Sequence, residues 1–182
     1  MSPTPVPKEF TAIVILAPHE VQVALAPYRL KYGFEGAVRV PAHISLILPF
    51  VQLDELPQAE KKLRKICKTV APFDITLKSY QNFPYAIFLV PQHPQPIIHL
   101  FEKIYAAFPD YPPYAGAYGN QLAPHMTIAE FKTVEEREAV QAQLPPWKPM
   151  TFRTDRIHIL HGSAETVSPT IPYAIIHLGA VQ

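Results

Sequence analysis

Proline limits the length of every regular element that this chain can form. Of the 182 residues, 22 are proline, about 12% of the chain against a usual share near 5%. The prolines do not form a low-complexity tract but stand singly or in pairs between apolar segments, as at Pro18, Pro27, Pro41 and Pro49. Because proline lacks an amide proton and fixes its own φ, it interrupts helices and sheet ladders. We therefore expect short strands and helices joined by stiff turns.

Composition excludes several classes of protein. A chain of this length can bury a full core, and its longest apolar run, Ala12 to Ala17, is too short for a membrane span or a secretory leader. Cys67 is the single cysteine, so we expect neither a disulfide framework nor a cysteine zinc site, and a reducing cytoplasm fits best. The balance of 16 basic and 15 acidic residues argues against binding of long duplex nucleic acid through many phosphate contacts. A nucleic-acid end or a nucleotide remains a possible ligand.

Hydrophobic periodicity divides the chain into alternating strands and helices. It predicts strands over 10–17, 43–50, 73–80, 84–91, 125–131, 149–161 and 171–179, and helices over 19–32, 54–70, 95–108 and from Thr133 onward. Residues 81–83 should connect a hairpin, 109–124 should form a loop, and Cys67 should lie in the core. The two halves of this order resemble each other, which predicts an α+β fold of two similar lobes with a cleft between them.

Two strands that begin with histidine carry the candidate chemistry. The segments are Pro41-Ala42-His43-Ile44-Ser45-Leu46 and Ala123-Pro124-His125-Met126-Thr127-Ile128. A third His-x-Ser match begins at His161 but runs into glycine and a polar turn, so the tripeptide alone is weak. Because strand side chains alternate between faces, each of the two strands presents one imidazole and one hydroxyl side by side.

Two imidazoles and two hydroxyls around one cleft suit phosphodiester cleavage. One imidazole can take a proton from the attacking oxygen while the other protonates the departing oxygen, and the hydroxyls can hold the phosphate. This chemistry needs no metal. The alternative is structural, because a histidine after a proline at a strand start is often satisfied by backbone carbonyls. Two matching strands in corresponding halves favour the catalytic interpretation.

These motifs resemble the paired H-x-[ST]-apolar motifs of the two-histidine phosphoesterase superfamily, the 2′-5′ RNA ligase-like cyclic phosphodiesterases. The resemblance covers nearly the whole chain, 1–182, as a single bilobal domain. It implies pseudo-two-fold symmetry with two antiparallel sheets facing a central cleft and helices outside, and no cofactor. It also implies catalysis by His43 and His125, phosphate binding by Ser45 and Thr127, and 2′,3′-cyclic phosphates or 2′-5′ linkages as substrates. Ala42 stands where many members have proline.

Other residues have weaker claims. Tyr111, Tyr114 and Tyr118, in the loop before the second motif, could stack on a base, although an ordinary surface loop explains them as well. The resemblance to the family implies the same role for Phe83 in the hairpin turn, and among the tyrosines we select Tyr118. His158 and His161 should point to opposite strand faces, so no metal site is expected. Six cations are scattered, and one or two of them could steer phosphate: Arg29, Lys31, Arg39, Lys132, Arg153 and Arg156.

Three functions remain open from the sequence. The leading one is hydrolysis of 2′,3′-cyclic phosphates to 2′-phosphates. A binding module for a nucleotide or an RNA end, without turnover, would use the same cleft, and 2′-5′ ligation would use the same residues. The sequence does not distinguish oligomeric states.

Overall fold

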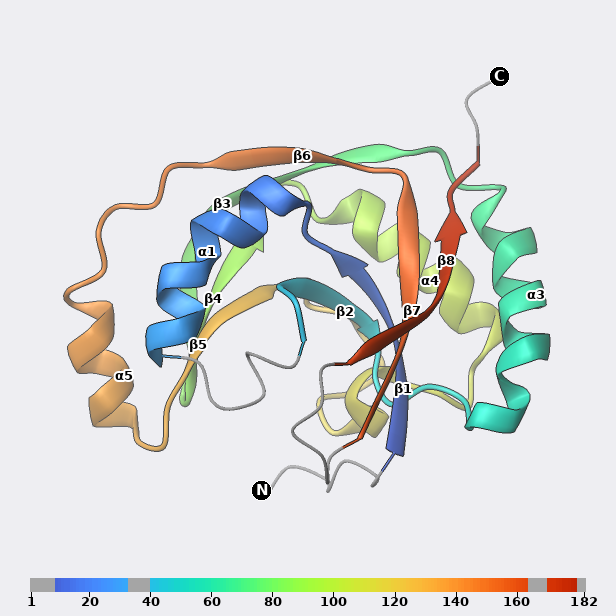
Figure 1. Cartoon of the computed structure of the whole chain (residues 1–182), viewed down its shortest axis with the longest axis horizontal. Helices are drawn as coiled ribbons and strands as arrows, with labels where there is room; N and C mark the ends of the chain where they lie inside the picture. The colour runs from blue at the N-terminus through green and yellow to red at the C-terminus, as the bar shows by residue number, and fades with distance from the viewer. Residues whose placement is uncertain (1–8, 33–39, 164–169, 180–182) are drawn as a thin grey trace.

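The computed structural model describes residues 9–32, 40–163 and 170–179. Eight strands and four α-helices occur in this part of the chain, with two short 3-10 turns, η1 and η2 (Figure 1). In chain order they are β1 (Glu9–Leu16), α1 (His19–Tyr32), β2 (His43–Ile47), η1 (Leu53–Glu55), α3 (Leu56–Cys67), β3 (Phe73–Phe83), β4 (Ala86–Pro91), α4 (Gln95–Ala107), η2 (Pro113–Gly116), β5 (Met126–Glu130), α5 (Val134–Gln141), β6 (Met150–Thr154), β7 (Arg156–Ser163) and β8 (Ile171–His177).

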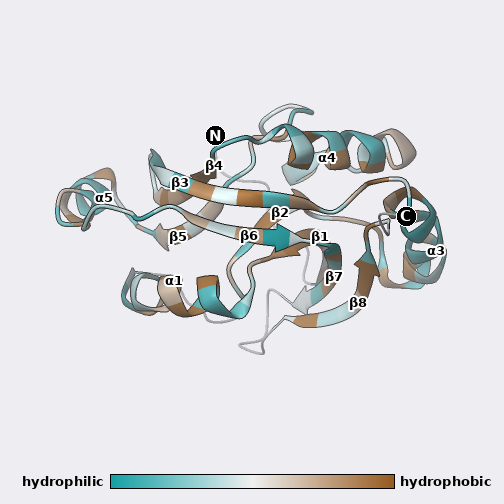
Figure 2. Ribbon diagram, turned by 90° about the horizontal axis from the view of Figure 1, so that it is seen from above, coloured by the Kyte–Doolittle hydropathy of each residue, from teal (hydrophilic) through white to brown (hydrophobic). Residues whose placement is uncertain are grey.

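The strands form two antiparallel four-stranded sheets, which confirms the α+β prediction. Their orders are β2-β1-β7-β8 in the first sheet and β5-β4-β3-β6 in the second. Each histidine motif supplies an edge strand, β2 in one sheet and β5 in the other, so the two sheets have matching orders. Helices α3 and α5 lie at opposite ends of the long axis (Figure 1), and α1 and α4 lie on opposite sides of the molecule (Figure 2).

The lobes are not the two halves of the sequence, contrary to our expectation. The hairpin β3-β4 follows the first motif in the chain but joins the sheet of the second motif, and β7-β8 follows the second motif but joins the sheet of the first. The symmetry therefore relates two interleaved sheets. Strand pairing across the molecule decides this exchange, and local periodicity does not report it.

The predicted strand over 149–161 is also two strands in different sheets. It breaks at Asp155, between β6 and β7. The side chains that join the main core are Phe152, at an even position in β6, and Ile157 and Ile159, at odd positions in β7. Because of this change of phase, the strand face that points to the core is reversed as the chain passes from one sheet to the other.

The predicted hairpin also differs in its turn. Residues 81–83 belong to β3, and the turn is Pro84-Tyr85.

One face of each motif strand belongs to the main core. Ile44, Leu46, Met126 and Ile128 are fully or almost fully buried there, as is Cys67 on α3. The side chains of His43, Ser45, His125 and Thr127 alternate with them and are only partly buried. Strands β2 and β5 lie side by side in Figure 1 and contact each other directly, and the charge of His125 acts on His43. The hydrophobic pattern thereby brings the two motifs together.

Candidate active site

The two imidazoles are held by the same backbone device. Nδ1 of His43 lies 2.7 Å from the carbonyl oxygen of Pro41, and Nδ1 of His125 lies 2.8 Å from that of Ala123. Each acceptor stands two residues before its histidine. A proton on Nδ1 satisfies each carbonyl, which leaves Nε2 of both rings without a hydrogen-bond partner among the described residues. The backbone contact that the structural alternative predicts is therefore made by Nδ1 alone, and it leaves Nε2 of each ring available.

The two hydroxyl residues lie beside the imidazoles. Ser45 pairs with Val14 across the β1-β2 ladder, and His43 pairs with Leu16, so both motif side chains share the face of Val14 and Leu16. Thr127 pairs with Phe88 across β4-β5. Within the first sheet this face is lined by a small second apolar cluster around Val14. In the first sheet, Ser45, His43 and His158 are thus polar groups beside this apolar cluster.

Within residues 9–32, 40–163 and 170–179, aromatic rings contact His125, and none contacts His43. Phe83 lies edge-on to the His125 ring with 5.3 Å between centroids, and buried Phe88 lies 5.0 Å from it. Tyr114 is nearly parallel to the same ring, at 6.3 Å and 20°. Tyr118 contacts Tyr114 at 5.8 Å but is 77% exposed. The predicted position of Phe83 is therefore at the site, and Tyr118 lies at its outer edge.

Arg29 on α1 ties the two motifs together. One guanidinium nitrogen donates to the carbonyl oxygen of Thr127 at 2.8 Å, and the other donates to that of Val40 at 2.5 Å. Its planar fork reaches both carbonyls at once, which lysine could not do. Glu130 on β5 contributes an attractive charge. Among the six cations named from the sequence, Arg29 bonds to Thr127 of the second motif and to Val40, the residue before the first motif. Arg153 and Arg156 pair with Asp74 and Asp155. Arg39 lies outside the described residues.

The site keeps both imidazoles neutral. Burial lowers the pKa of His43 to about 4, and the charges of Arg29 and His125 lower it further, against the hydrogen bond to Pro41, which raises it. Burial also lowers the pKa of His125, while its bond to Ala123 opposes the shift. Arg29 acts on His43 in this way and not on His125. Both rings are neutral near pH 7 before any anion arrives, and an anion between them would raise both pKa values.

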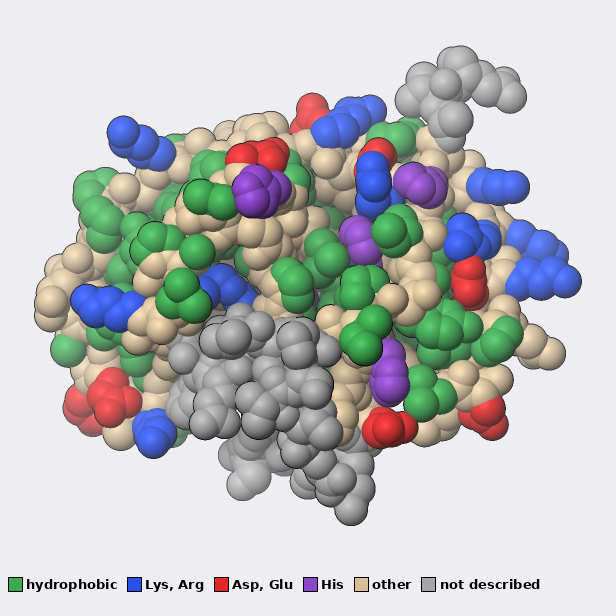
Figure 3. All heavy atoms as spheres, in the orientation of Figure 1, with side chains coloured by type: hydrophobic (Ala, Val, Ile, Leu, Met, Phe, Trp, Pro, Cys, Tyr) green, Lys and Arg blue, Asp and Glu red, His purple; other side chains and the backbone are tan. Residues whose placement is uncertain are grey.

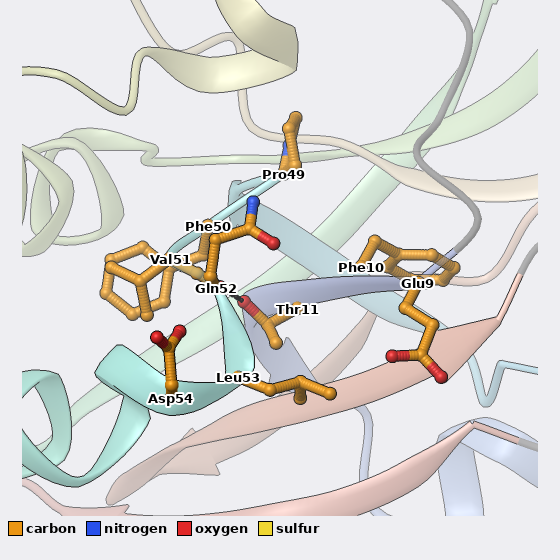
Figure 4. Close-up of a pocket in the computed structure, with 9 residues that line it drawn as sticks. All are labelled: Glu9, Phe10, Thr11, Pro49, Phe50, Val51, Gln52, Leu53 and Asp54. Carbon is orange, nitrogen blue, oxygen red and sulfur yellow. Dashed lines mark hydrogen bonds between the residues drawn. The ribbon is translucent and has the colours of Figure 1, made fainter.

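Among the other histidines, His158 shares the Val14 face of the first sheet with Ser45, because both residues pair with Val14 from opposite sides. His158 pairs with Val14 and His161 with Thr11, which places them on opposite faces of β7 as predicted. The described residues contain no group of three or more His, Cys, Asp or Glu side chains placed to hold a metal ion. A hollow of about 290 Å³ lies at the start of β1, where Thr11 donates to the carbonyl of Val51 (Figure 4). It shares no residue with the histidine motifs.

On the face drawn in Figure 3, lysine and arginine side chains lie mostly around the edge. Several of them gather on the right, where Figure 1 places α3. Among the helices that the structure describes, none is long and apolar enough to cross a lipid bilayer.

The fold and the paired motifs define a class: an α+β protein with two matching sheets whose edge strands bring two His-x-Ser/Thr sequences together. The model of the 2′-5′ RNA ligase superfamily matches residues 17–166, and the chain belongs to this superfamily of two-histidine phosphoesterases. A comparison with curated proteins gives no match.

Solved structures support the same fold. The chain is similar to TT0787 of Thermus thermophilus, with 18% identity, a TM-score of 0.65, and 93% of this chain and 97% of that one covered. It is similar to Escherichia coli LigT complexed with 3′-AMP, with 16% identity, a TM-score of 0.62, and 95% and 99% covered. A structure described as a phosphoesterase gives 16% identity, a TM-score of 0.64, and 94% and 99% covered. At these identities the likeness establishes the fold.

Sequence reasoning missed Phe88, named Tyr114 only as one of three loop tyrosines that could stack on a base, and did not single out Arg29 among the six cations. Phe88 follows from the sheet register, because it faces Thr127 across the ladder. Arg29 and Tyr114 are 98 and 11 positions from the second motif residues that they approach, Thr127 and His125. No spacing rule connects them to the motifs, since only the packing of α1 and η2 against the strands does so.

Proposed function

We propose that the protein is a metal-independent phosphodiesterase that hydrolyses 2′,3′-cyclic phosphates, on RNA ends or nucleotides, to 2′-phosphates. The observation that carries the proposal is the matched anchoring of His43 and His125 through Nδ1, which leaves two Nε2 atoms for proton transfer. Superfamily membership supports the reaction class. The similar LigT structures are complexes with 3′-AMP and ATP, which supports a nucleotide as ligand.

The reaction follows from these groups. Water attacks phosphorus while a neutral imidazole takes its proton at Nε2, so that the new P–O bond forms. The bond from phosphorus to O3′ breaks on the opposite side, and the second imidazole, as imidazolium, gives its proton to O3′. Hydrogen bonds from Ser45 and Thr127 would hold the non-bridging oxygens and keep the three centres in line.

We assign the base to His43 and the acid to His125. The pKa of His43 is lowered the more, with Arg29 contributing, so this ring is the better placed to be neutral before attack. The aromatic rings gather at His125, where they would pack against the nucleoside, and the departing O3′ belongs to that nucleoside. The same asymmetry would bind the substrate in one orientation and yield one product.

Incubation with 2′,3′-cyclic mononucleotides, a cyclic-ended oligoribonucleotide and a 2′-5′ dinucleotide tests the proposal, with and without excess chelator. We expect chelator-resistant conversion of the cyclic ends to 2′-phosphates, resolved from 3′-phosphates by chromatography. His43→Ala and His125→Ala should each lower turnover by roughly 10² to 10⁴.

The other results have defined meanings. Binding of the product without turnover by the wild type would identify a binding module instead. Joining of 2′-5′ ends as the main activity would identify a ligase. A strict need for added metal, or full activity in either histidine variant, would refute the paired acid-base mechanism.

A further inference from the structure

The first sheet continues the face of Ser45 across three further strands. Ser45 pairs with Val14 on β1, and Val14 pairs in turn with His158 on β7. His158 pairs with Ile175 on β8. Paired residues of antiparallel strands project to the same face of a sheet. Because neighbouring strands lie about 4.8 Å apart, His158 lies about 10 Å and Ile175 about 14 Å from Ser45. The row therefore extends from the candidate active site to the edge of the sheet.

His158 is the side chain of this row, beyond Ser45, that can form hydrogen bonds. Its Nδ1 is buried and has no hydrogen-bond partner among the described residues. An unpaired buried nitrogen costs free energy, and packing alone does not explain its presence. The second torsion of a histidine side chain is soft, so the ring can turn either nitrogen toward a ligand.

The surroundings of His158 keep its imidazole neutral. Burial lowers the pKa of His158, the charges of Arg156 and His177 act in the same direction, and the charge of Asp155 opposes them. A neutral imidazole offers one donor and one acceptor. It therefore suits a ribose hydroxyl or the edge of a base better than it suits a phosphate.

Strand β8 adds exposed apolar side chains beside His158. Tyr173 and Ile175 are each 42% exposed. They flank Ala174, which packs against the main core, so alternation places both on the face of His158. β8 is an edge strand and lies on the side of the molecule opposite α4 (Figure 2). We call His158, Tyr173 and Ile175 the β7-β8 wall.

The β7-β8 wall has the chemistry of a nucleoside site. An aromatic ring on a sheet face is a surface on which a base stacks, and this stacking tolerates any base. A neutral hydrogen-bonding ring beside it suits the sugar or the base edge. The aromatic rings around His125 are on the other sheet, so the two groups of rings lie on different sides of the proposed phosphate position.

We infer that the β7-β8 wall is a second nucleoside subsite, which binds the nucleoside on the side of the phosphate away from His125. The inference rests on the proposed function for the position of the phosphate. Tyr173 stacks on the base of this nucleoside, and His158 forms a hydrogen bond with its ribose or its base. A ligand with a nucleoside on each side of one phosphate should therefore bind better than a ligand with one nucleoside.

Calorimetry with two probes tests the inference. A nucleoside 2′-monophosphate carries one nucleoside, and a 2′-5′ dinucleoside monophosphate carries two. All proteins carry His125→Ala, so that neither probe is cleaved during the measurement. The test variants are His158→Phe and Tyr173→Ala. The controls are His99→Phe on α4 and Val23→Ala on α1, at exposed positions outside the β7-β8 wall. Thermal unfolding checks the fold of each protein.

We expect the His125→Ala protein to bind the dinucleoside probe more tightly than the mononucleotide. His158→Phe should weaken binding of the dinucleoside probe by roughly three- to tenfold, as loss of one neutral hydrogen bond does. Tyr173→Ala should weaken it by roughly tenfold, as loss of one base stack does. Both variants should bind the mononucleotide with unchanged affinity, and the two controls should leave both affinities unchanged.

The results separate this inference from the proposed function, which turnover of cyclic phosphate by the wild type tests. Equal affinity for the two probes, or equal losses for both probes in the variants, would overturn the inference even with turnover intact. A selective loss of dinucleoside affinity would uphold it even if the wild type shows no turnover and the proposed reaction fails. Binding of neither probe would overturn it. Because the two variants lie on different strands, one of them decides the test if the other does not fold.

Discussion

Lowering the pH from 7 to 5 should destabilise the protein, and His43 should account for a measurable part of that loss. The ring has a pKa of about 4 in the folded protein because it is buried beside Arg29. In the unfolded chain an exposed histidine has a pKa of about 6.5. Between these two values the unfolded chain binds a proton that the folded protein does not, so acid favours unfolding.

The size of the effect follows from the same two pKa values. The folded pKa is the lower one, so this contribution to stability is complete above about pH 6.5 and is lost as the pH falls toward 4. At pH 5 the unfolded chain has gained most of the proton while folded His43 is still neutral. Each pH unit within this window is worth about 1.4 kcal/mol, and pH 5 lies about 1.5 units below its upper limit. The loss between pH 7 and 5 is therefore about 2 kcal/mol.

Urea unfolding at both pH values measures it. His43→Asn removes the titrating group but keeps a donor for the Pro41 carbonyl, and His99→Asn, at an exposed position on α4, is the matched control. The free energy of unfolding of His43→Asn should fall by about 2 kcal/mol less than that of wild type when the pH is lowered. If His43→Asn loses as much stability as wild type between pH 7 and 5, the buried, neutral state of His43 is wrong.

Three further predictions follow from the site. Arg29→Lys keeps the charge but cannot donate to two carbonyls at once, so the free energy of unfolding should fall by about 1 to 3 kcal/mol. Arg29→Met also removes the charge, so it should raise the pKa of His43 and move the acidic limb of the pH profile of kcat/KM to higher pH. An acidic limb that does not move would contradict this. Thr127→Val should weaken binding of a nucleoside 2′-monophosphate by roughly 10- to 100-fold in calorimetry, and unchanged affinity would mean that its hydroxyl faces away. Ala115→Gly should raise the free energy of unfolding by about 0.5 to 1 kcal/mol, because glycine tolerates its positive φ, whereas a loss of stability in urea unfolding would show no strain there.

Local chemistry determined the elements and the motif faces. The β-branched run of β1, the stripe that buries Leu56, Leu63 and Cys67 on α3, and the start of α5 at Thr133 are properties of neighbouring residues, and the structure bears them out. Thr133 accepts a hydrogen bond from the amide of Glu136, as the sequence predicts. The alternation within each His-x-Ser/Thr segment likewise follows from strand geometry alone.

Tertiary structure decided which elements pair and which distant side chains reach the motifs. Local patterns do not encode the exchange of β3-β4 and β7-β8 between the sheets, because pairing depends on contacts far apart in the chain. The same holds for Arg29, whose bonds to Val40 and Thr127 exist only when α1 packs against β5 and reaches the residues just before β2.

The contrast is sharpest at Tyr114. In the sequence it is one of three tyrosines in a proline-rich loop, and its exposed neighbour Tyr118 had the better claim to a substrate. In the fold, Tyr114 and Ala115 are two successive left-handed residues, and the ring of Tyr114 lies nearly parallel to that of His125. The sequence alone determined that two imidazoles and two hydroxyls would share matching strands, because alternation is a local property. Only the folded chain decided how those groups are oriented, since burial, charge and backbone strain depend on all the elements around them.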